Sequence, residues 1–308
     1  MLSAVRQLFV RWYETSLERD VSGAPTHVAV IQDGNRRYAR SRGQAAPDGH
    51  RAGAKTTERV LQWCRDLGIE ELTLYAFSTE NFNRPRHERD ALYDLLEEKL
   101  YEFTDSEEVH TNEVRIQALG EIDRLPERVR QAVAYAEDRT RHYDRFKLNI
   151  ALAYGGRSEL LNAARDVTRA VADGDLSPDE IDVEELSGRL YDTELRDVDL
   201  IIRTGGDERT SNFLPWHANG NEAAVFFCTP YWPEFSKIDF LRAVRTYEHR
   251  EASWQRTRMR RALFLLRALS DVELTIARDV VQGVREDSTT AAVQSESNVE
   301  PDLGAEST

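Results

Sequence analysis

Residues 27–43 read HVAVIQDGNRRYARSRG, and this stretch decides how the rest of the chain is interpreted. The run 28–31 is short, apolar and rich in β-branched residues, which predicts a buried strand. Asp33 and Gly34 follow it, and a cluster of arginines comes next. Glycine allows backbone N–H groups to approach a ligand closely, and a helix that starts here would point the positive end of its dipole at an anion. The stretch predicts a strand-to-helix junction that binds a polyanion, with a carboxylate available for a metal ion.

The arginines stand out because the chain as a whole is acidic. It carries 41 Lys+Arg against 55 Asp+Glu, a formal net charge of -14, with a pI of about 5.1. This balance disfavours a general attraction to nucleic acid, so we expect no nucleic-acid partner. The arginine clusters therefore need local reasons, although a solvated helix face is an open alternative for two of them, Arg40 and Arg42. The clustered arginines are Arg36, Arg37, Arg40, Arg42 and Arg51, followed by Arg84, Arg86, Arg203 and Arg209 in later loops.

Composition and length divide the 308 residues into three expected parts. Residues 1–25 form an amphipathic segment that packs on its own domain or a partner subunit, or rests on a membrane surface. Residues 26–270 form the folded domain, and residues 285–308 are acidic, Ser/Thr-rich and predicted to be disordered. The two cysteines form no CxxC pair, which favours a reducing cytosol. No apolar run approaches the ~20 residues of a transmembrane helix.

Strand-like and helix-like segments alternate along the chain. The expected strands are 27–32, 72–77, 114–119, 148–152, 198–202 and 223–227. The expected helices are 53–67, 88–109, 126–143, 158–171 and 178–191, with a last one over 237–269 in which a break is left open. This alternation predicts an α/β fold, a single domain with a central, mainly parallel six-stranded sheet flanked by helices.

Unusual polar loops follow several of these strands. The loop after the second strand, 78–85, reads STENFNRP, and the loop after the fifth, 203–213, reads RTGGDERTSNF. Ligands of open parallel sheets bind beyond the carboxyl ends of the strands. The topology therefore predicts that one rim of the sheet gathers Asp33, Asn81, Arg84, Arg203, Arg209 and Ser211.

With these loops in place, the chain resembles the cis-prenyltransferases, the undecaprenyl diphosphate synthase family, and in particular its archaeal members. The matching strings follow the family's order and spacing from about residue 26 to 250. They are HVAVIQDGNRR, GHRAGAK (49–55), LTLYAFSTENFNRP (72–85), NIALAYGGR (149–157), DLIIRTGGDERTSNFLPW (199–216) and YWPEF (231–235).

The resemblance implies an enzyme that elongates an allylic diphosphate with isopentenyl diphosphate in cis geometry and uses Mg²⁺. It implies a homodimer in the cytoplasm, peripheral on the inner face of the cell membrane, whose undecaprenyl-length product enters the membrane as the precursor of a glycosyl carrier lipid. Geranylgeranyl diphosphate is the favoured primer and farnesyl diphosphate the alternative. A noncatalytic partner subunit is the alternative function; a general nucleotide-binding protein is less consistent, because no GxGxxG or GxxxxGK[ST] loop occurs.

A hydrophobic tunnel is expected between the helix 88–109 and the sheet. The expected wall of this tunnel consists of Leu92, Leu95, Leu96, Leu100 and Phe103. The open alternative is that these side chains only pack in the hydrophobic core.

The resemblance also assigns roles to residues. Asp33 and Asn81 are the expected catalytic residues. Asp33 is expected to bind Mg²⁺, with Glu222 as a second carboxylate on the metal side. Asn81 occupies the position that the family associates with proton handling. A purely structural role stays open for each of these residues: helix capping for Asp33, turn formation for Asn81 and a place at the sheet edge for Glu222. The expected substrate-binding residues are Gly34, Asn35, Arg36, Arg37, Tyr38 and His50 for the allylic diphosphate, Ser78, Thr79, Glu80, Phe82 and Arg84 beside the reacting centre, and Arg203, Arg209, Thr210 and Ser211 for isopentenyl diphosphate.

The chain departs from the family pattern in four places. Ala46 stands where bacterial relatives carry an arginine for the diphosphate, and Arg42 or Arg51 could replace it. Phe82 stands where Trp is common in the family, and Asp207 stands where Glu is usual. Residues 248–253 lack the RxG ending of many members.

Overall fold

The computed structural model describes residues 2–190, 195–218, 223–254, 256–257 and 259–261, with side chains from residue 10 onward. The chain forms two compact units, Met1–Arg250 and Glu251–Thr308. The larger unit contains the whole sheet, and the described residues of the smaller one are helical. The expectations for 262–270 and for the tail 285–308 lie outside the described residues.

The larger unit is built on one six-stranded sheet in which every described strand pairing is parallel. The order across the sheet is β3-β4-β2-β1-β5-β6. The strands are β1 His27–Ile31, β2 Glu71–Tyr75, β3 Val114–Leu119, β4 Phe146–Ala151, β5 Leu200–Arg203 and β6 Ala224–Phe227. The predicted α/β class is thus confirmed, with all of the described strands parallel.

The central strand β1 sets the position of the site. All five of its residues are buried, and successive side chains enter opposite faces of the sheet, as strand geometry requires. The register places Ile31 opposite both Tyr75 and Arg203, so three strands end at the same level. The loops that follow them therefore leave from one edge of the sheet.

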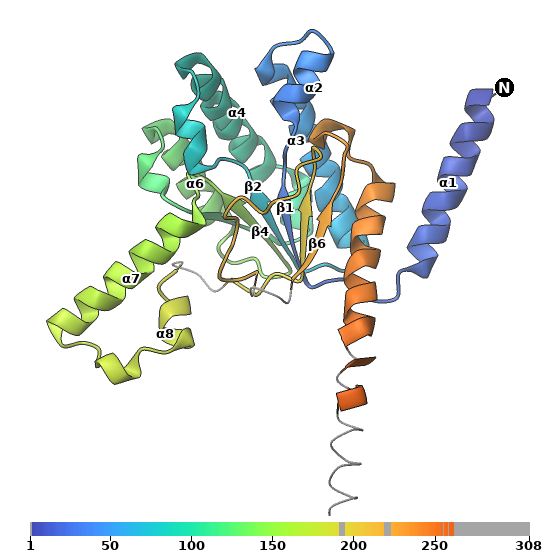
Figure 1. Cartoon of the computed structure of the whole chain (residues 1–308). Helices are drawn as coiled ribbons and strands as arrows, with labels where there is room; N and C mark the ends of the chain where they lie inside the picture. The colour runs from blue at the N-terminus through green and yellow to red at the C-terminus, as the bar shows by residue number, and fades with distance from the viewer. Residues whose placement is uncertain (1, 191–194, 219–222, 255, 258, 262–308) are drawn as a thin grey trace, which may run out of the picture. The chain divides into compact units, whose positions relative to one another are not determined.

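Helices flank the sheet (Figure 1). They are α1 Leu2–Asp20, α2 Asn35–Ser41, α3 Ala46–Asp66, α4 Arg86–Thr104, α5 Glu107–Thr111, α6 Glu127–Thr140, α7 Gly156–Asp173 and α8 Val183–Ser187. Short 3₁₀ turns are η1 Thr79–Asn83, η2 Ile122–Arg124, η3 Pro178–Glu180 and η4 Trp232–Glu234, and a further helix covers 237–250. Helix α4 packs beside α6, and α3 contacts both α4 and η4.

Two predicted helices were wrong in extent because local capping decided their ends. Helix α3 begins seven residues early, with Pro47 in its first turn, a position that proline suits. The predicted helix 88–109 is split into α4 and α5, because Ser106 caps α5 by accepting a hydrogen bond from Val109 N at 3.4 Å.

The predicted helix 178–191 was also wrong. The chain forms η3 and then α8, which starts where Asp182 caps it by accepting a hydrogen bond from Glu185 N at 2.8 Å. A capped restart after a 3₁₀ turn explains why one continuous helix does not form here.

Helix α4 packs its apolar side on the main core. Leu92 and Leu100 are buried, and Leu96 and Phe103 are partly buried against the same cluster. Core packing is thus what these side chains do in this structure. Among the described residues, no helix is both long and apolar enough to cross a membrane.

Candidate active site

Asp33 lies just beyond the carboxyl end of β1, between two arginines. Its Oδ2 accepts a hydrogen bond from Arg203 Nη2 at 2.7 Å, and its Oδ1 lies 3.1 Å from Arg37 Nη2. Burial alone would raise the pKa of Asp33, but the hydrogen bond from Arg203 and the charge of Arg37 outweigh it and hold that pKa below its ordinary value. Asp33 is therefore a carboxylate at neutral pH, the form that binds a metal ion.

Arg203, the last residue of β5, organises the loop that follows. Its side chain is only 4% exposed, and Nη1 donates to the carbonyl of Arg209 and to Ser211 Oγ, both at 2.6 Å. Nη2 also lies 3.3 Å from Asp207, which pairs in turn with Arg209 at 3.3 Å and with Arg37 at 3.5 Å. Three arginines thus face two carboxylates in this cluster, called the Asp33 cluster below. Its net positive charge suits a polyanion.

Two glycines let the backbone come close to this cluster. Gly34 and Gly205 have φ values of 99° and 87°, in the left-handed region that side chains disfavour. A Cβ on Gly34 would lie 2.6 Å from Tyr231 Cδ1, and one on Gly205 would lie 2.7 Å from Arg37 Nη2. Both positions therefore require glycine, for conformation and for space.

Sequence reasoning missed two residues that hold Asp33 in place. Thr204 Oγ1 and the backbone N of Trp232 both donate to the carbonyl oxygen of Asp33, at 2.7 and 3.0 Å. Thr204 follows Arg203, and Trp232 belongs to the YWPEF string, so both stood within motifs. Nothing in a sequence, however, shows that two distant groups share one acceptor.

A second charged group lies near the starts of α3 and α4. Glu88 Oε1 lies 3.3 Å from Arg36 Nη2, and Arg84 Nη1 lies 3.4 Å from His50 Nε2. Burial and the charges of Arg84 and Arg36 lower the pKa of His50 to about 4, so this ring is neutral at pH 7. Burial and the charge of Arg36 lower the pKa of Arg84 as well.

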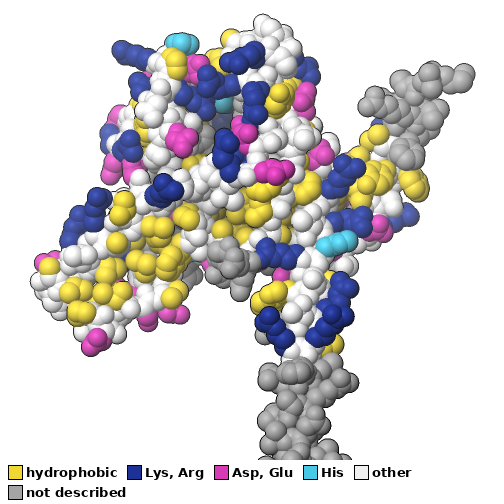
Figure 2. Space-filling view, in the orientation of Figure 1, with side chains coloured by type: hydrophobic (Ala, Val, Ile, Leu, Met, Phe, Trp, Pro, Cys, Tyr) yellow, Lys and Arg dark blue, Asp and Glu magenta, His cyan; other side chains and the backbone are white. Residues whose placement is uncertain are grey.

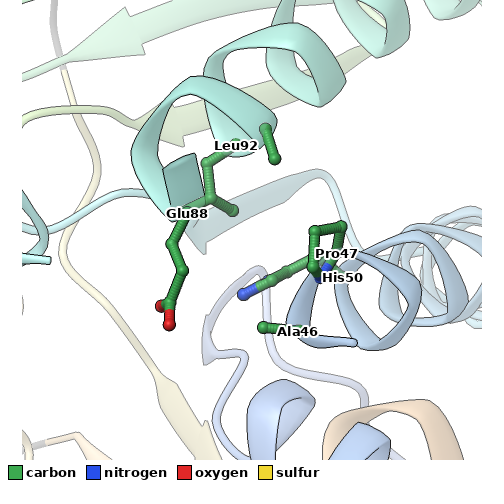
Figure 3. A pocket seen from close by; sticks show the side chains of 6 residues that line it. Ala46, Pro47, His50, Glu88 and Leu92 are labelled. Carbon is green, nitrogen blue, oxygen red and sulfur yellow. The ribbon is translucent and has the colours of Figure 1, made fainter. Parts of the chain in front are cut away.

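This second group borders a narrow hollow between α3 and α4 (Figure 3). The hollow is lined by Ala46, Pro47, His50, Glu88, Ala91 and Leu92. Ala46 presents a methyl group here where bacterial relatives were expected to carry an arginine. The two suggested replacements pair elsewhere, Arg42 with Glu234 at 3.5 Å and Arg51 with Asp48 at 3.3 Å. Arg36 forms an ion pair with Glu88 of the hollow wall, and Arg84 contacts His50 of the same wall.

The loop after β2 is stabilised by a hydrogen bond between two of its own residues. Asn81 Oδ1 accepts a hydrogen bond from Ser78 N at 3.1 Å, so Asn81 stabilises its own turn. Thr79 N donates to the carbonyl of Tyr154 at 2.9 Å, and Glu80 is exposed. Within the described part of the chain, no hydrogen bond or ion pair joins Asn81 to the Asp33 cluster.

Phe82, in the same loop, belongs to the core side of the site. Its ring centroid lies 5.2 Å from that of Phe77, and the guanidinium of Arg124 lies 4.3 Å from the Phe82 centroid. The aromatic ring at this position is therefore used in packing.

The remaining expected ligands make contacts within the protein. Asn35 Nδ2 donates to the carbonyl of Gln32 at 3.2 Å, and the ring of Tyr38 lies 4.4 Å from the guanidinium of Arg42. The carbonyl of Thr210 accepts a backbone hydrogen bond within its own loop. These contacts place the three residues around the site, and Asn35 Oδ1 is buried without a hydrogen-bond partner among the described residues.

The donor set at Asp33 fits Mg²⁺ together with a substrate. No three His, Cys, Asp or Glu side chains converge in the described ranges, and Glu222 lies outside them. Mg²⁺, however, is usually bound by one or two carboxylates together with substrate phosphates and water. An ionised Asp33 beside arginines meets that requirement, because Asp33 would hold the ion and the arginines the phosphates.

Sheet and site together define an α/β enzyme for phosphorylated substrates, with arginines and a carboxylate at the carboxyl edge of a parallel sheet. A family model described as putative undecaprenyl diphosphate synthase matches residues 31–255. The chain belongs to this family of prenyltransferases, the cis-prenyltransferases, as its motifs predicted.

Individual relatives agree with this assignment. The tritrans,polycis-undecaprenyl-diphosphate synthase (geranylgeranyl-diphosphate specific) of Halobacterium salinarum is 66% identical over 269 residues, which cover 87% of this chain and 89% of the relative. The protein of the same name from Haloarcula marismortui is 58% identical over 286 residues, covering 93% and 94%.

Solved structures are similar as well. Lavandulyl diphosphate synthase from Lavandula x intermedia, in complex with dimethylallyl diphosphate, is similar with a TM-score of 0.69 and 34% identity, over 73% of this chain and 95% of that chain. A probable undecaprenyl diphosphate synthase from Campylobacter jejuni has a TM-score of 0.59 and 32% identity, over 73% and 96%.

Proposed function

We propose that this chain adds isopentenyl diphosphate units in cis geometry to geranylgeranyl diphosphate and stops near undecaprenyl length, which gives the precursor of a glycosyl carrier lipid. The observation that carries the proposal is the Asp33 cluster, which joins two carboxylates, the ionised Asp33 among them, to three arginines at the carboxyl edge of the sheet. The relatives from Halobacterium salinarum and Haloarcula marismortui are both named as geranylgeranyl-diphosphate specific, which supports the primer. Farnesyl diphosphate is the alternative primer.

The cluster is suited to help the diphosphate depart. When the allylic C–O bond breaks, negative charge develops on the leaving diphosphate and positive charge on the allylic carbon. Arg36 and Arg37 would hold the allylic diphosphate, while Arg203, Arg209 and Ser211 would hold isopentenyl diphosphate. A preorganised donor of this kind contributes about 2.7 to 4 kcal/mol. Mg²⁺, when bound at Asp33, would supply further charge neutralisation on the diphosphate.

The next step forms the new carbon–carbon bond. The double-bond electrons of isopentenyl diphosphate attack the allylic carbon. Loss of a proton from C2 of the isopentenyl unit then restores a double bond. Asn81 is a poor base because it is an amide whose Oδ1 already accepts from Ser78. We therefore assign the proton to an oxygen of the departed diphosphate, with Asn81 shaping the loop beside it.

The growing chain would extend along α4. One hollow is bordered by Leu92, and a second lies between α4, α6, β3 and β4 and is bordered by Leu100. Leu92 and Leu100 are eight residues, or about two helical turns, apart, so the two hollows border successive parts of α4. This arrangement supports a hydrophobic tunnel in which the packed side chains part to admit the product.

A homodimer and a membrane-facing product complete the proposal. Leu161, Ile181 and Val183 are 58%, 43% and 62% exposed. Hydrophobic side chains gather over α7 and α8 (Figure 2), a patch that a second copy of the chain would cover. We place the enzyme in the cytoplasm, with its long apolar product passing to the inner face of the cell membrane.

A noncatalytic partner subunit is not favoured. Such a subunit would not need the charged groups of a diphosphate site, yet Asp33, Arg203 and Ser211 are present and joined by hydrogen bonds.

The test is a primer comparison. Purified protein, Mg²⁺ and radiolabelled isopentenyl diphosphate are incubated with farnesyl or geranylgeranyl diphosphate, and the products are sized by chromatography. The expected result is extension of geranylgeranyl diphosphate to undecaprenyl length, with slower use of farnesyl diphosphate and no extension in EDTA. Extension of neither primer would overturn the proposal, and a preference for farnesyl diphosphate would overturn the primer assignment.

A further inference from the structure

Glu88, which lines the hollow in Figure 3, forms an ion pair with Arg36 that joins two elements. Arg36 belongs to α2, and Glu88 to the first turn of α4, with 3.3 Å between Nη2 and Oε1. The Glu88 side chain is 15% exposed and that of Arg36 45%. Only one oxygen of Glu88 is used, since Oε2 is buried and has no hydrogen-bond partner among the described residues. A buried carboxylate oxygen without a donor is costly, so this pair is less stable than one in which both carboxylate oxygens have donors.

The charges around Glu88 are mainly positive. Arg36 and Arg84 each carry a full charge, and their repulsion contributes to the lowered pKa of Arg84. His50 is neutral at pH 7 and so adds no charge. Glu88 is the carboxylate that pairs with Arg36 here. A diphosphate carries more negative charge and more acceptor oxygens than one carboxylate, so Arg36 gains by changing partner.

We propose that Glu88 acts as an internal substitute for the substrate diphosphate: it holds Arg36 while the site is empty and is displaced when the allylic diphosphate binds. This inference rests on the proposed function and adds how its site is regulated. Glu88 is thus a positioning residue that competes with the substrate, and Arg36 supplies a phosphate contact where Ala46 supplies none.

Displacement of Glu88 would also affect the hydrophobic residues along which the prenyl chain is proposed to extend. Ala91 and Leu92 lie three and four residues after Glu88, on the same side of α4, and line the hollow with it. The Arg36–Glu88 pair ties this turn of α4 to α2. Capture of the diphosphate by Arg36 would release the turn, so that binding of the charged end and entry of the prenyl chain are coupled.

The test uses inorganic pyrophosphate as the probe and isothermal titration calorimetry on the full chain. Glu88→Gln should bind pyrophosphate about threefold to tenfold more tightly than wild type, because the competing charge is gone. Arg36→Gln should bind more weakly, and the double variant should bind like Arg36→Gln. The matched control is Asp90→Asn, which removes the exposed Arg86–Asp90 pair of the same helix and should leave the affinity unchanged.

Steady-state kinetics give the second readout. Glu88→Gln should lower KM for the allylic primer without raising kcat, whereas loss of a merely structural contact would not tighten binding. Wild-type or weaker pyrophosphate binding by Glu88→Gln would overturn the inference, because Glu88 would then hold Arg36 ready for the substrate. Equal tightening in the Arg36→Gln background would also overturn it, since the effect would be one of general charge. Pyrophosphate binding does not require turnover, so a failure of the proposed function alone leaves this result readable.

Discussion

The two ends of the same sheet both carry polar side chains, but they use them differently. At the amino end, His27 Nδ1 donates to the carbonyl of Arg196 at 2.9 Å, so its Nε2 accepts from Thr73 Oγ1 at 2.7 Å. Asn149 Nδ2 donates to Glu71 Oε1 at 2.7 Å and to Thr73 at 3.1 Å. These residues, called the amino-end network below, are almost completely buried.

The carboxyl end differs in exposure and in charge. Asp33 and Arg37 are partly exposed, Arg209 is exposed, and the cluster they belong to is net positive. The amino-end network pairs most of its groups internally, although Glu71 Oε2 has no hydrogen-bond partner among the described residues, whereas the Asp33 cluster keeps groups that a ligand can take over. The comparison teaches that buried polar groups paired with one another hold the fold, and that half-exposed, unbalanced charges mark the site.

The largest expected effect is a loss of activity from a substitution in the Asp33 cluster at the carboxyl end of the sheet. Asp33→Asn should lower the rate of isopentenyl transfer by about 10²- to 10³-fold, because a neutral amide cannot replace the metal-binding carboxylate. The free energy of unfolding should fall only modestly, because the attraction of Asp33 to Arg37 and Arg203 is lost while Arg203 keeps Asp207 and Ser211. Initial rates with radiolabelled isopentenyl diphosphate and urea unfolding check the two parts. A near-normal rate would remove Asp33 from the chemistry.

A pH titration sharpens the contrast at the amino end. Burial lowers the pKa of His27 to about 4 from its ordinary 6.5. The unfolded chain therefore takes up a proton between pH 6.5 and 4 that the folded chain does not, and the stability falls as pH falls through this window. The full loss is about 3 kcal/mol. The unfolding free energy of His27→Gln should depend less steeply on pH; equal slopes would contradict the burial argument.

Removing one donor from the amino-end network should cost stability but not activity. Asn149→Ala leaves Glu71 Oε1 without that donor and should lower the free energy of unfolding by about 1 to 3 kcal/mol. The value of kcat/KM per folded molecule should stay unchanged. Gln131→Ala, which removes an exposed 3.0 Å hydrogen bond to Glu127, is the control. A loss of activity larger than the loss of folded protein would show that the two ends are coupled.

The smallest effect concerns one exposed arginine of the Asp33 cluster. Arg209→Gln should raise KM for isopentenyl diphosphate about tenfold, the worth of one charge-assisted hydrogen bond, and leave the unfolding free energy unchanged. Arg169→Gln removes an equally exposed arginine that pairs with Asp166 on α7, and should change neither quantity. If both variants behave alike, Arg209 is only a surface charge.

The sequence predicted the sheet well because its strands are short apolar runs whose burial leaves few alternatives. It also predicted that Asp33, Arg203, Arg209 and Ser211 meet, since parallel strands deliver their loops to one edge. Helix ends were predicted less well, because single capping residues such as Ser106 override an apolar pattern.

The rest of the site depends on long-range contacts that no local pattern reveals. The Arg36–Glu88 pair joins residues 52 positions apart, and the Asn149–Glu71 bond joins residues 78 apart. Asn81 was expected in the chemistry on family grounds, while its hydrogen bond to Ser78, three residues away, is a local effect that the turn alternative had anticipated.

The most direct test of the central claim is a crystal structure of the protein with Mg²⁺ and geranylgeranyl thiolodiphosphate, an analogue that resists ionisation. We expect the diphosphate between Asp33 and Arg37, with Arg36 turned from Glu88 to a phosphate oxygen and the prenyl chain entering the hollow beside Leu92. Density for the diphosphate away from the carboxyl edge of the sheet would contradict the account.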